Sequence, residues 1–118
     1  MKKKVYYLAS CSTCQRIMKE VGVDGSFEQQ NIKEQAITAA QLDEMYQLAG
    51  SYEALFSRRS MKYREWNLQD KALGENDYRD LILKEYTFLK RPVFIINGQI
   101  FIGNTNKAVA DAIAALNP

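Results

Sequence analysis

The two cysteines of this chain, Cys11 and Cys14, stand three positions apart between a strand-like run and a helix-like segment. The apolar run Val5-Tyr6-Tyr7-Leu8-Ala9 precedes them directly, so a Cys-x-x-Cys pair follows a strand and opens a helix. This layout is typical of a thiol–disulfide redox site. The first helical turn aims backbone N–H groups at the leading sulfur and favours its thiolate. We therefore expect Cys11 to attack and Cys14 to resolve.

Two other interpretations of the cysteine pair stay open. Structural zinc takes four Cys or His ligands, and the chain has two cysteines and no histidine, so only a zinc site shared between subunits remains. We expect no metal within one chain. The second interpretation is a pair of inert buried thiols, because free cysteine is often a small core residue.

The absence of histidine also narrows the chemistry that Cys11 can perform. Neither a Cys-His nor a Ser-His pair can form, and no histidine can act as a general base. Activation of Cys11 must therefore come from the helix terminus, from neighbouring cations or from the hydroxyls of Ser10, Ser12 and Thr13.

Length and charge set further bounds. A chain of 118 residues fits one domain, residues 1–118, with a core that needs no disulfide. The net charge of +2 argues against an acidic tail and against a protein that coats nucleic acid. The N-terminus is basic, but the apolar run after it is too short for a signal-peptide core, and the residues after Ala9 are too polar to span a membrane. We expect a cytoplasmic protein with no direct nucleic-acid or membrane partner.

Basic residues gather in two places. Arg58, Arg59, Lys62 and Arg64 fall within seven positions, and Lys90-Arg91 stands before a proline. Such clusters are usually solvated faces, but beside a thiolate they would hold an anion.

The first third of the chain predicts a β-α-β unit. Residues 4–9 form the first expected strand, and Ile17, Met18 and Val21 recur at helical spacing before a left-handed stop at Gly22. A weaker strand is expected at 26–32. Two strands joined by a helix form a parallel pair through a right-handed crossover.

The middle of the chain predicts helices. Thr38 stands three residues before Gln41, which indicates a capped helix that ends near Gly50. A short helix is expected at 51–56, a loop or irregular turn at 57–64, and a further helix capped by Asn76.

The last third predicts a hairpin and a helix. Two apolar runs, 93–96 and 99–102, flank Asn97-Gly98, which indicates a type I′ turn. Thr105 then opens an alanine-rich helix. The whole order predicts an α/β fold with a thioredoxin-like four-stranded mixed sheet and a helical insertion at about 36–88. The cysteine pair then lies at the carboxyl end of the first strand, where open α/β sheets bind ligands.

The chain also resembles the arsenate reductase-like (ArsC/Spx) family, small thioredoxin-fold proteins that include glutathione-dependent arsenate reductases and the transcription regulator Spx. The similarity spans essentially the whole chain and is carried by four stretches, which are Tyr6-Tyr7-Leu8-Ala9-Ser10-Cys11-Ser12-Thr13-Cys14-Gln15-Arg16, Leu55-Phe56-Ser57-Arg58-Arg59-Ser60-Met61-Lys62-Tyr63-Arg64, Leu83-Lys84-Glu85-Tyr86-Thr87-Phe88-Leu89-Lys90-Arg91-Pro92-Val93-Phe94-Ile95 and Ile102-Gly103.

The resemblance implies roles for particular residues. The family's catalytic cysteine falls on Cys11, and its Arg-Pro pair falls on Arg91-Pro92, where the proline is expected to be cis and to face the cysteine. Family arginines bind the oxyanion, because a guanidinium fits arsenate or phosphate in a bidentate way. Arg91 is the first candidate for this role, with Arg58 or Arg59 beside it. Ser12 and Thr13, next to the cysteine, are further candidates for anion or substrate binding. The family implies no bound cofactor, but a thiol co-substrate such as glutathione, with glutaredoxin or thioredoxin as a partner.

The chain departs from the arsenate reductases of this group at two points. Their middle arginine aligns with Ser57 or, with a one-residue slip, with Arg58, and their arginine after the hairpin aligns near Gly103-Asn104, which offers no cation. The second cysteine, Cys14, supplies an internal partner as in Spx. Three hypotheses follow: a thiol oxidoreductase acting on an oxyanion or a mixed disulfide, an Spx-like redox switch that binds the RNA polymerase α subunit, and a family member without activity.

Overall fold

The computed structural model describes all residues, 1–118, and the chain divides into two compact units. The sheet unit comprises residues 1–36 and 91–118, and the helical unit comprises residues 37–90. The helical segment expected between the second and third strands is therefore present. A single domain over 1–118 stays a prediction.

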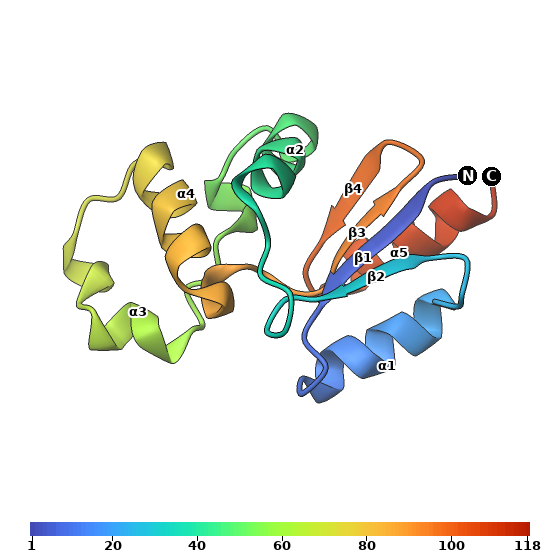
Figure 1. Ribbon diagram of the computed structural model, residues 1–118, viewed down its shortest axis with the longest axis horizontal. Coiled ribbons are helices and arrows are strands. Elements are labelled where there is room, and N and C mark those ends of the chain that lie inside the picture. Colours follow the sequence, from blue (N-terminus) through green and yellow to red (C-terminus); the bar gives the residue numbers. More distant parts are fainter. The chain divides into compact units, whose positions relative to one another are not determined.

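The sheet unit contains four strands and two helices (Figure 1). In chain order they are β1 (Lys3–Tyr7), α1 (Ser12–Val21), β2 (Glu28–Asn31), β3 (Val93–Ile96), β4 (Gln99–Ile102) and α5 (Asn106–Leu116). The strand order is β2-β1-β3-β4, with β1 parallel to β2 and both other pairs antiparallel. The register places Tyr7 opposite Asn31 and Val5 opposite Phe94. The predicted four-stranded mixed sheet is confirmed.

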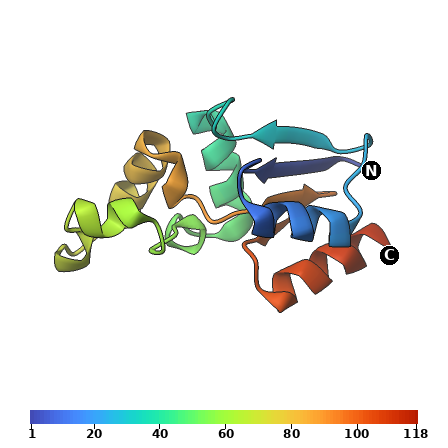
Figure 2. The same ribbon diagram turned by 90° about the horizontal axis from the view of Figure 1, so that it is seen from below.

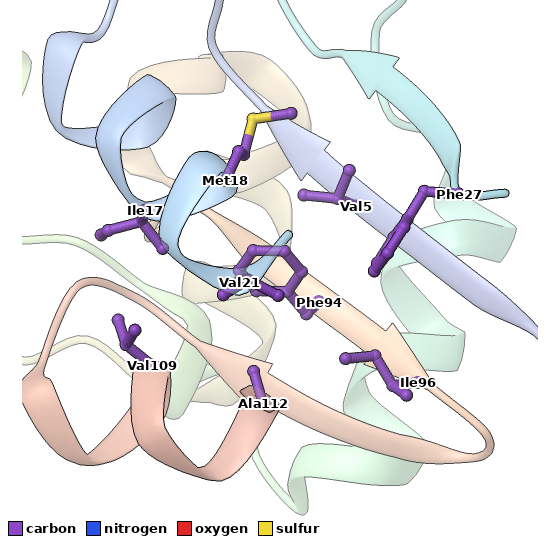
Figure 3. Packing of buried hydrophobic residues seen from close by; sticks show 9 residues of the cluster. All are labelled: Val5, Ile17, Met18, Val21, Phe27, Phe94, Ile96, Val109 and Ala112. Carbon is purple, nitrogen blue, oxygen red and sulfur yellow. The ribbon is translucent and has the colours of Figure 1, made fainter. Parts of the chain in front are cut away.

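Both helices of the sheet unit contribute to one apolar core, and Figure 2 shows them alongside the strands. The helical spacing of Ile17, Met18 and Val21 gives α1 a buried face, and α5 adds smaller side chains. Figure 3 shows the members of this core: Val5, Ile17, Met18, Val21, Phe27, Phe94, Ile96, Val109 and Ala112. Burial of each large apolar side chain contributes about 1.5–3 kcal/mol. This packing holds α1 against the sheet and so fixes its N-terminus close to the end of β1.

Local signals account for the ends of these elements. Gly22 has a φ of 88° and closes α1, as predicted. Asn97 and Gly98 have φ values of 51° and 83°, so both central residues of the hairpin turn are left-handed, as a type I′ turn requires. Thr105 caps α5 by accepting a hydrogen bond from the N–H of Ala108.

The helical unit is built from short helices around aromatic side chains. It contains α2 (Ala39–Ala49), η1 (Glu53–Leu55), α3 (Met61–Glu65), η2 (Leu68–Asp70), α4 (Glu75–Lys84) and η3 (Tyr86–Phe88). Phe56 stacks on Phe88 with ring centroids 5.0 Å apart and lies 4.8 Å from Tyr78. The predicted capping box of α2 is present, because Thr38 and Gln41 each accept from the other's backbone N–H.

Two predictions for the helical unit were wrong. The segment 57–64, expected as a loop, contains the start of α3, which Ser60 caps by accepting from the N–H of Lys62. This helix buries no side chain, so no apolar period marks it. The N-cap of α4 is Gly74 rather than Asn76, because Asp77 accepts from the Gly74 N–H.

The chain has no helix that combines the length and the apolar character needed to cross a membrane.

Candidate active site

The cysteine pair lies on a tight turn between β1 and α1. The N–H of Cys11 donates to the carbonyl of Leu8 at 3.0 Å, which closes a turn with Ala9 and Ser10 at its centre. Cys11 is then the N-cap of α1, with extended backbone (φ −93°, ψ 110°), and its carbonyl accepts the first helical hydrogen bond, from the N–H of Gln15 at 3.1 Å. The turn therefore presents the Cys11 side chain at the N-terminus of α1.

The surroundings of Cys11 favour its thiolate. Partial burial raises the pKa of this thiol, but the backbone N–H and the thiol of Cys14, the charge of Arg91 and the N–H of Thr13 together lower it further. The net pKa lies below the ordinary value for cysteine. The N–H groups of Thr13 and Cys14, in the first turn of α1, are the backbone groups that stabilise the ionised sulfur. Helix N-termini and nearby cations lower cysteine pKa values by this mechanism.

Cys14 has the opposite character. It is 0% exposed, and burial together with the neighbouring Cys11 raises the pKa of its thiol to about 11. Both cysteines are reduced in the structure. The half-exposed Cys11 is therefore the thiol of lower pKa and better access. The roles of attacking and resolving cysteine stay predictions.

Arg91 and Pro92 begin the second part of the sheet unit. The Arg91–Pro92 peptide bond is cis, as the family resemblance implies. Arg91 is half-buried, its Nε atom is buried, and its charge lowers the pKa of Cys11. The positive charge of Arg91 thus reaches the sulfur at which an anion would bind.

The other proposed anion-binding residues have different surroundings. Arg58 lies in the helical unit, where its Nη2 donates to Glu53 Oε2 at 2.8 Å and to the hydroxyl of Tyr78 at 2.9 Å. An oxyanion at Arg58 would therefore compete with a carboxylate that is already bound. Arg59, in the same unit, is exposed.

Ser12 and Thr13 form the first turn of α1, next to the Cys11 sulfur. Ser12 is exposed and Thr13 is half-buried, and the backbone N–H of Thr13 contributes to the stabilisation of the thiolate. Gly103 and Asn104, after β4, offer no charge. The anion-binding roles of Arg91, Arg58, Arg59, Ser12 and Thr13 stay predictions.

Sequence analysis missed two residues of the site, Asn31 and Gln15. Asn31 Oδ1 accepts from the N–H of Ala9 at 3.3 Å, and Gln15 Nε2 donates to the carbonyl of Ala9 at 3.2 Å. Gln15 follows Cys14 directly, which could have marked it, whereas Asn31 is 22 residues from Ala9 and carries no local signal.

The family model named ArsC family matches residues 6–112 of the chain. The chain belongs to the ArsC family. The uncharacterized protein YusI of Bacillus subtilis (strain 168) is 26% identical over 102 residues, which cover 83% of this chain and 86% of YusI. The resemblance seen in the sequence is therefore confirmed at the level of the family.

Solved structures confirm the fold. An arsenate reductase from Vibrio cholerae is 20% identical and superposes with a TM-score of 0.77, covering 95% of this chain and 98% of that one. An arsenate reductase (ArsC) related protein from Brucella melitensis is 20% identical, with a TM-score of 0.68 and coverage of 91% and 90%. Both proteins share the fold described above.

Proposed function

We propose that this ArsC-family protein is a thiol oxidoreductase whose Cys11 thiolate attacks an oxyanion such as arsenate, or a mixed disulfide. One observation carries the proposal: Cys11 is half-exposed at the N-terminus of α1, and backbone N–H groups and Arg91 lower its pKa. Family membership supports it, because the family includes arsenate reductases.

The proposed reduction of arsenate takes two steps at the Cys11 sulfur. The Cys11 thiolate bonds to arsenic(V), and one arsenate oxygen leaves as water after protonation. A second thiol then attacks the Cys11 sulfur, the S–As bond breaks, and its electron pair stays on arsenic, which leaves as arsenite(III). Arsenic gains two electrons, and the two thiols lose two electrons as they form a disulfide.

The second thiol is glutathione, the thiol of glutaredoxin or thioredoxin, or Cys14. An external thiol can approach the half-exposed Cys11 from solvent, whereas Cys14 is buried and keeps its proton at neutral pH, which supports glutathione in this step. A further thiol then reduces the disulfide and returns Cys11 to its starting state. This chemistry suits a reducing compartment, so we propose a cytoplasmic location.

The Cys11→Ser variant tests the proposal. We expect it to lower arsenate reduction to the uncatalysed level in an assay coupled to glutathione and glutaredoxin, because serine at neutral pH is not ionised. The Cys14→Ser variant serves as the comparison, since it keeps the attacking sulfur and removes only the internal thiol. Undiminished turnover by Cys11→Ser contradicts the proposal.

An Spx-like switch is the second candidate, and the contact between the two thiols favours it. The thiol of Cys14 interacts with the sulfur of Cys11, so oxidation would join them in a disulfide. The partner would be the RNA polymerase α subunit. Binding of purified α subunit to the oxidised chain but not the reduced one, with no arsenate turnover, supports this candidate, and equal absence of binding in both states rejects it.

A further inference from the structure

Side chains from two different elements hold both backbone groups of Ala9. The N–H of Ala9 donates to Asn31 Oδ1 at 3.3 Å, and its carbonyl accepts from Gln15 Nε2 at 3.2 Å. Asn31 ends β2, and Gln15 lies in the first turns of α1. The turn that they hold is the one closed by the hydrogen bond from Cys11 N–H to the Leu8 carbonyl.

The end of the β1–β2 ladder explains the position of Asn31. The N–H of Ile32 donates to the carbonyl of Tyr7 at 2.9 Å, and this is the last rung between the two strands. The next rung would need the N–H of Ala9, but the chain turns there toward α1. The side-chain amide of Asn31 accepts that N–H in place of a backbone carbonyl, so the ladder extends by one bond into the turn.

Gln15 secures the turn from its other side. Its backbone N–H donates to the Cys11 carbonyl at 3.1 Å, and its side chain reaches back to Ala9. One residue therefore fixes the backbone on both sides of Ser10. Because the rotation of the Cys11 side chain starts from this backbone, the bonds to Ala9 also limit where the sulfur can lie.

We propose that Asn31 and Gln15 are positioning residues that keep the Cys11 sulfur over the first turn of α1 by holding the Ala9–Ser10 turn. This inference rests on the proposed function, in which that sulfur reacts. Both side chains are neutral amides and bond to Ala9 rather than to the sulfur. They therefore act through geometry, by keeping the N–H groups of Thr13 and Cys14 directed at Cys11.

The experiment compares Gln15→Ala, Asn31→Ala and the double variant with a matched control, Gln29→Ala. Gln29 is an exposed residue of β2 whose Nε2 also donates to a backbone carbonyl at 3.2 Å, that of Asp24, away from the cysteine turn. The readout is the rate of Cys11 alkylation by iodoacetamide against pH on the full chain, with the modified cysteine identified by peptide mapping. We expect Gln15→Ala to stay folded, since Gln15 is an exposed residue of α1 and alanine has the highest helix propensity.

We expect the pKa of Cys11 to rise in the double variant by about 0.5–1 unit, which lowers alkylation about three- to tenfold at pH values well below that pKa. Each single variant should show part of the shift, and Gln29→Ala should match the wild type. A role limited to stability would lower the melting temperature and leave the pH profile unchanged.

The outcomes separate this inference from the proposed function. If the pKa of Cys11 is lowered in the wild type but the alkylation profiles of all variants match it, the positioning role is overturned and the proposed function stands. A shift in the double variant supports it, with or without arsenate turnover. A wild-type Cys11 pKa at the ordinary value overturns both, because no stabilised thiolate would remain to position.

Discussion

Cys11 and Cys14 differ in the pKa of their thiols because Cys11 is half-exposed at the N-terminus of α1, whereas Cys14 is buried in its first turn. Burial raises the pKa of Cys14 to about 11, so at neutral pH it keeps its proton and can donate a hydrogen bond to Cys11. That hydrogen bond, the backbone N–H groups and Arg91 lower the pKa of Cys11. At neutral pH Cys11 is therefore the thiol of lower pKa, and this holds without any histidine in the chain.

The Arg91→Gln variant tests whether the charge of Arg91 lowers the pKa of Cys11. In Arg91→Gln the pKa of Cys11 should rise, because a cation near a thiolate stabilises the charged form. A rise of about 0.5 unit would lower the thiolate fraction about threefold at pH values well below the pKa. Alkylation rates measured from pH 5 to 10 report this shift.

Lys90→Gln is the matched control, since it removes the same charge from the adjacent, exposed residue. We expect its profile to match the wild type. Equal profiles for Arg91→Gln and the wild type would show that Arg91 has no influence on the sulfur.

At the scale of the elements, the features that the sequence predicts well are those set by a local hydrogen bond or a single backbone angle. The Thr38 and Gln41 capping box, the Gly22 stop and the Asn97-Gly98 turn all involve residues at most three positions apart. The helix α3 was missed because it has no buried face, and the cap of α4 because Gly74 provides no side chain and the bonding group is Asp77.

Sequence analysis predicted the parts of the site that depend on neighbouring residues and missed the parts that depend on tertiary contacts. Cys11, Cys14 and the helix start follow from spacing, and Arg91-Pro92 follows from the family resemblance. Asn31 could not be found, because its contact with Ala9 depends on the register of β1 and β2. The pairing of Arg58 with Glu53 and Tyr78 also depends on tertiary structure, since Tyr78 is 20 residues away.

Partly exposed charged side chains join α2 to α4. Asp43 on α2 accepts from Arg79 on α4 through two bonds of 2.9 and 3.1 Å, and from the hydroxyl of Tyr52 at 2.6 Å. These bonds lower the pKa of Asp43 to about 2. The same pairing raises the pKa of Arg79, so the pair stays ionised over the whole neutral range.

Acid should therefore weaken the link between α2 and α4 in a defined range. The pKa of Asp43 is lower in the folded state than the value of about 3.9 for an unfolded chain, so its contribution to stability is complete above that pH and is lost as the pH falls toward 2. Urea midpoints of Asp43→Asn should lie below those of the wild type at pH 7, and the difference should shrink between pH 4 and 2.

Asp80→Asn is the control for this effect. Asp80 is 77% exposed and 3.9 Å from Arg79, so removing its charge should leave the midpoint almost unchanged. A difference between Asp43→Asn and the wild type that stays constant down to pH 2 would rule out titration of Asp43 as its source.

At the scale of the whole molecule, we expect the stability of the sheet unit to depend on the helical unit, because the helical unit lies between the two segments of the sheet unit in the sequence. The sheet unit consists of two separate segments, and β1 from the first segment pairs with β3 from the second. The helical unit is the connection between them. When the helical unit is unfolded, the sheet unit must close a long flexible loop of residues 37–90 at an entropic cost. Unfolding of residues 37–90 should therefore destabilise the sheet.

This coupling predicts that the sheet unit does not outlast the helical unit during unfolding. Trp66, the only tryptophan, lies in the helical unit, 5.5 Å from the ring of Phe88, so its fluorescence reports that unit. Cys14, fully buried in the sheet unit, reports the other unit through pulse alkylation. Cys14 should become reactive at or below the urea concentration of the fluorescence midpoint, because unfolding of residues 37–90 destabilises the sheet. A fluorescence transition completed before Cys14 becomes reactive would contradict this coupling and would show that the sheet survives closure of the long loop.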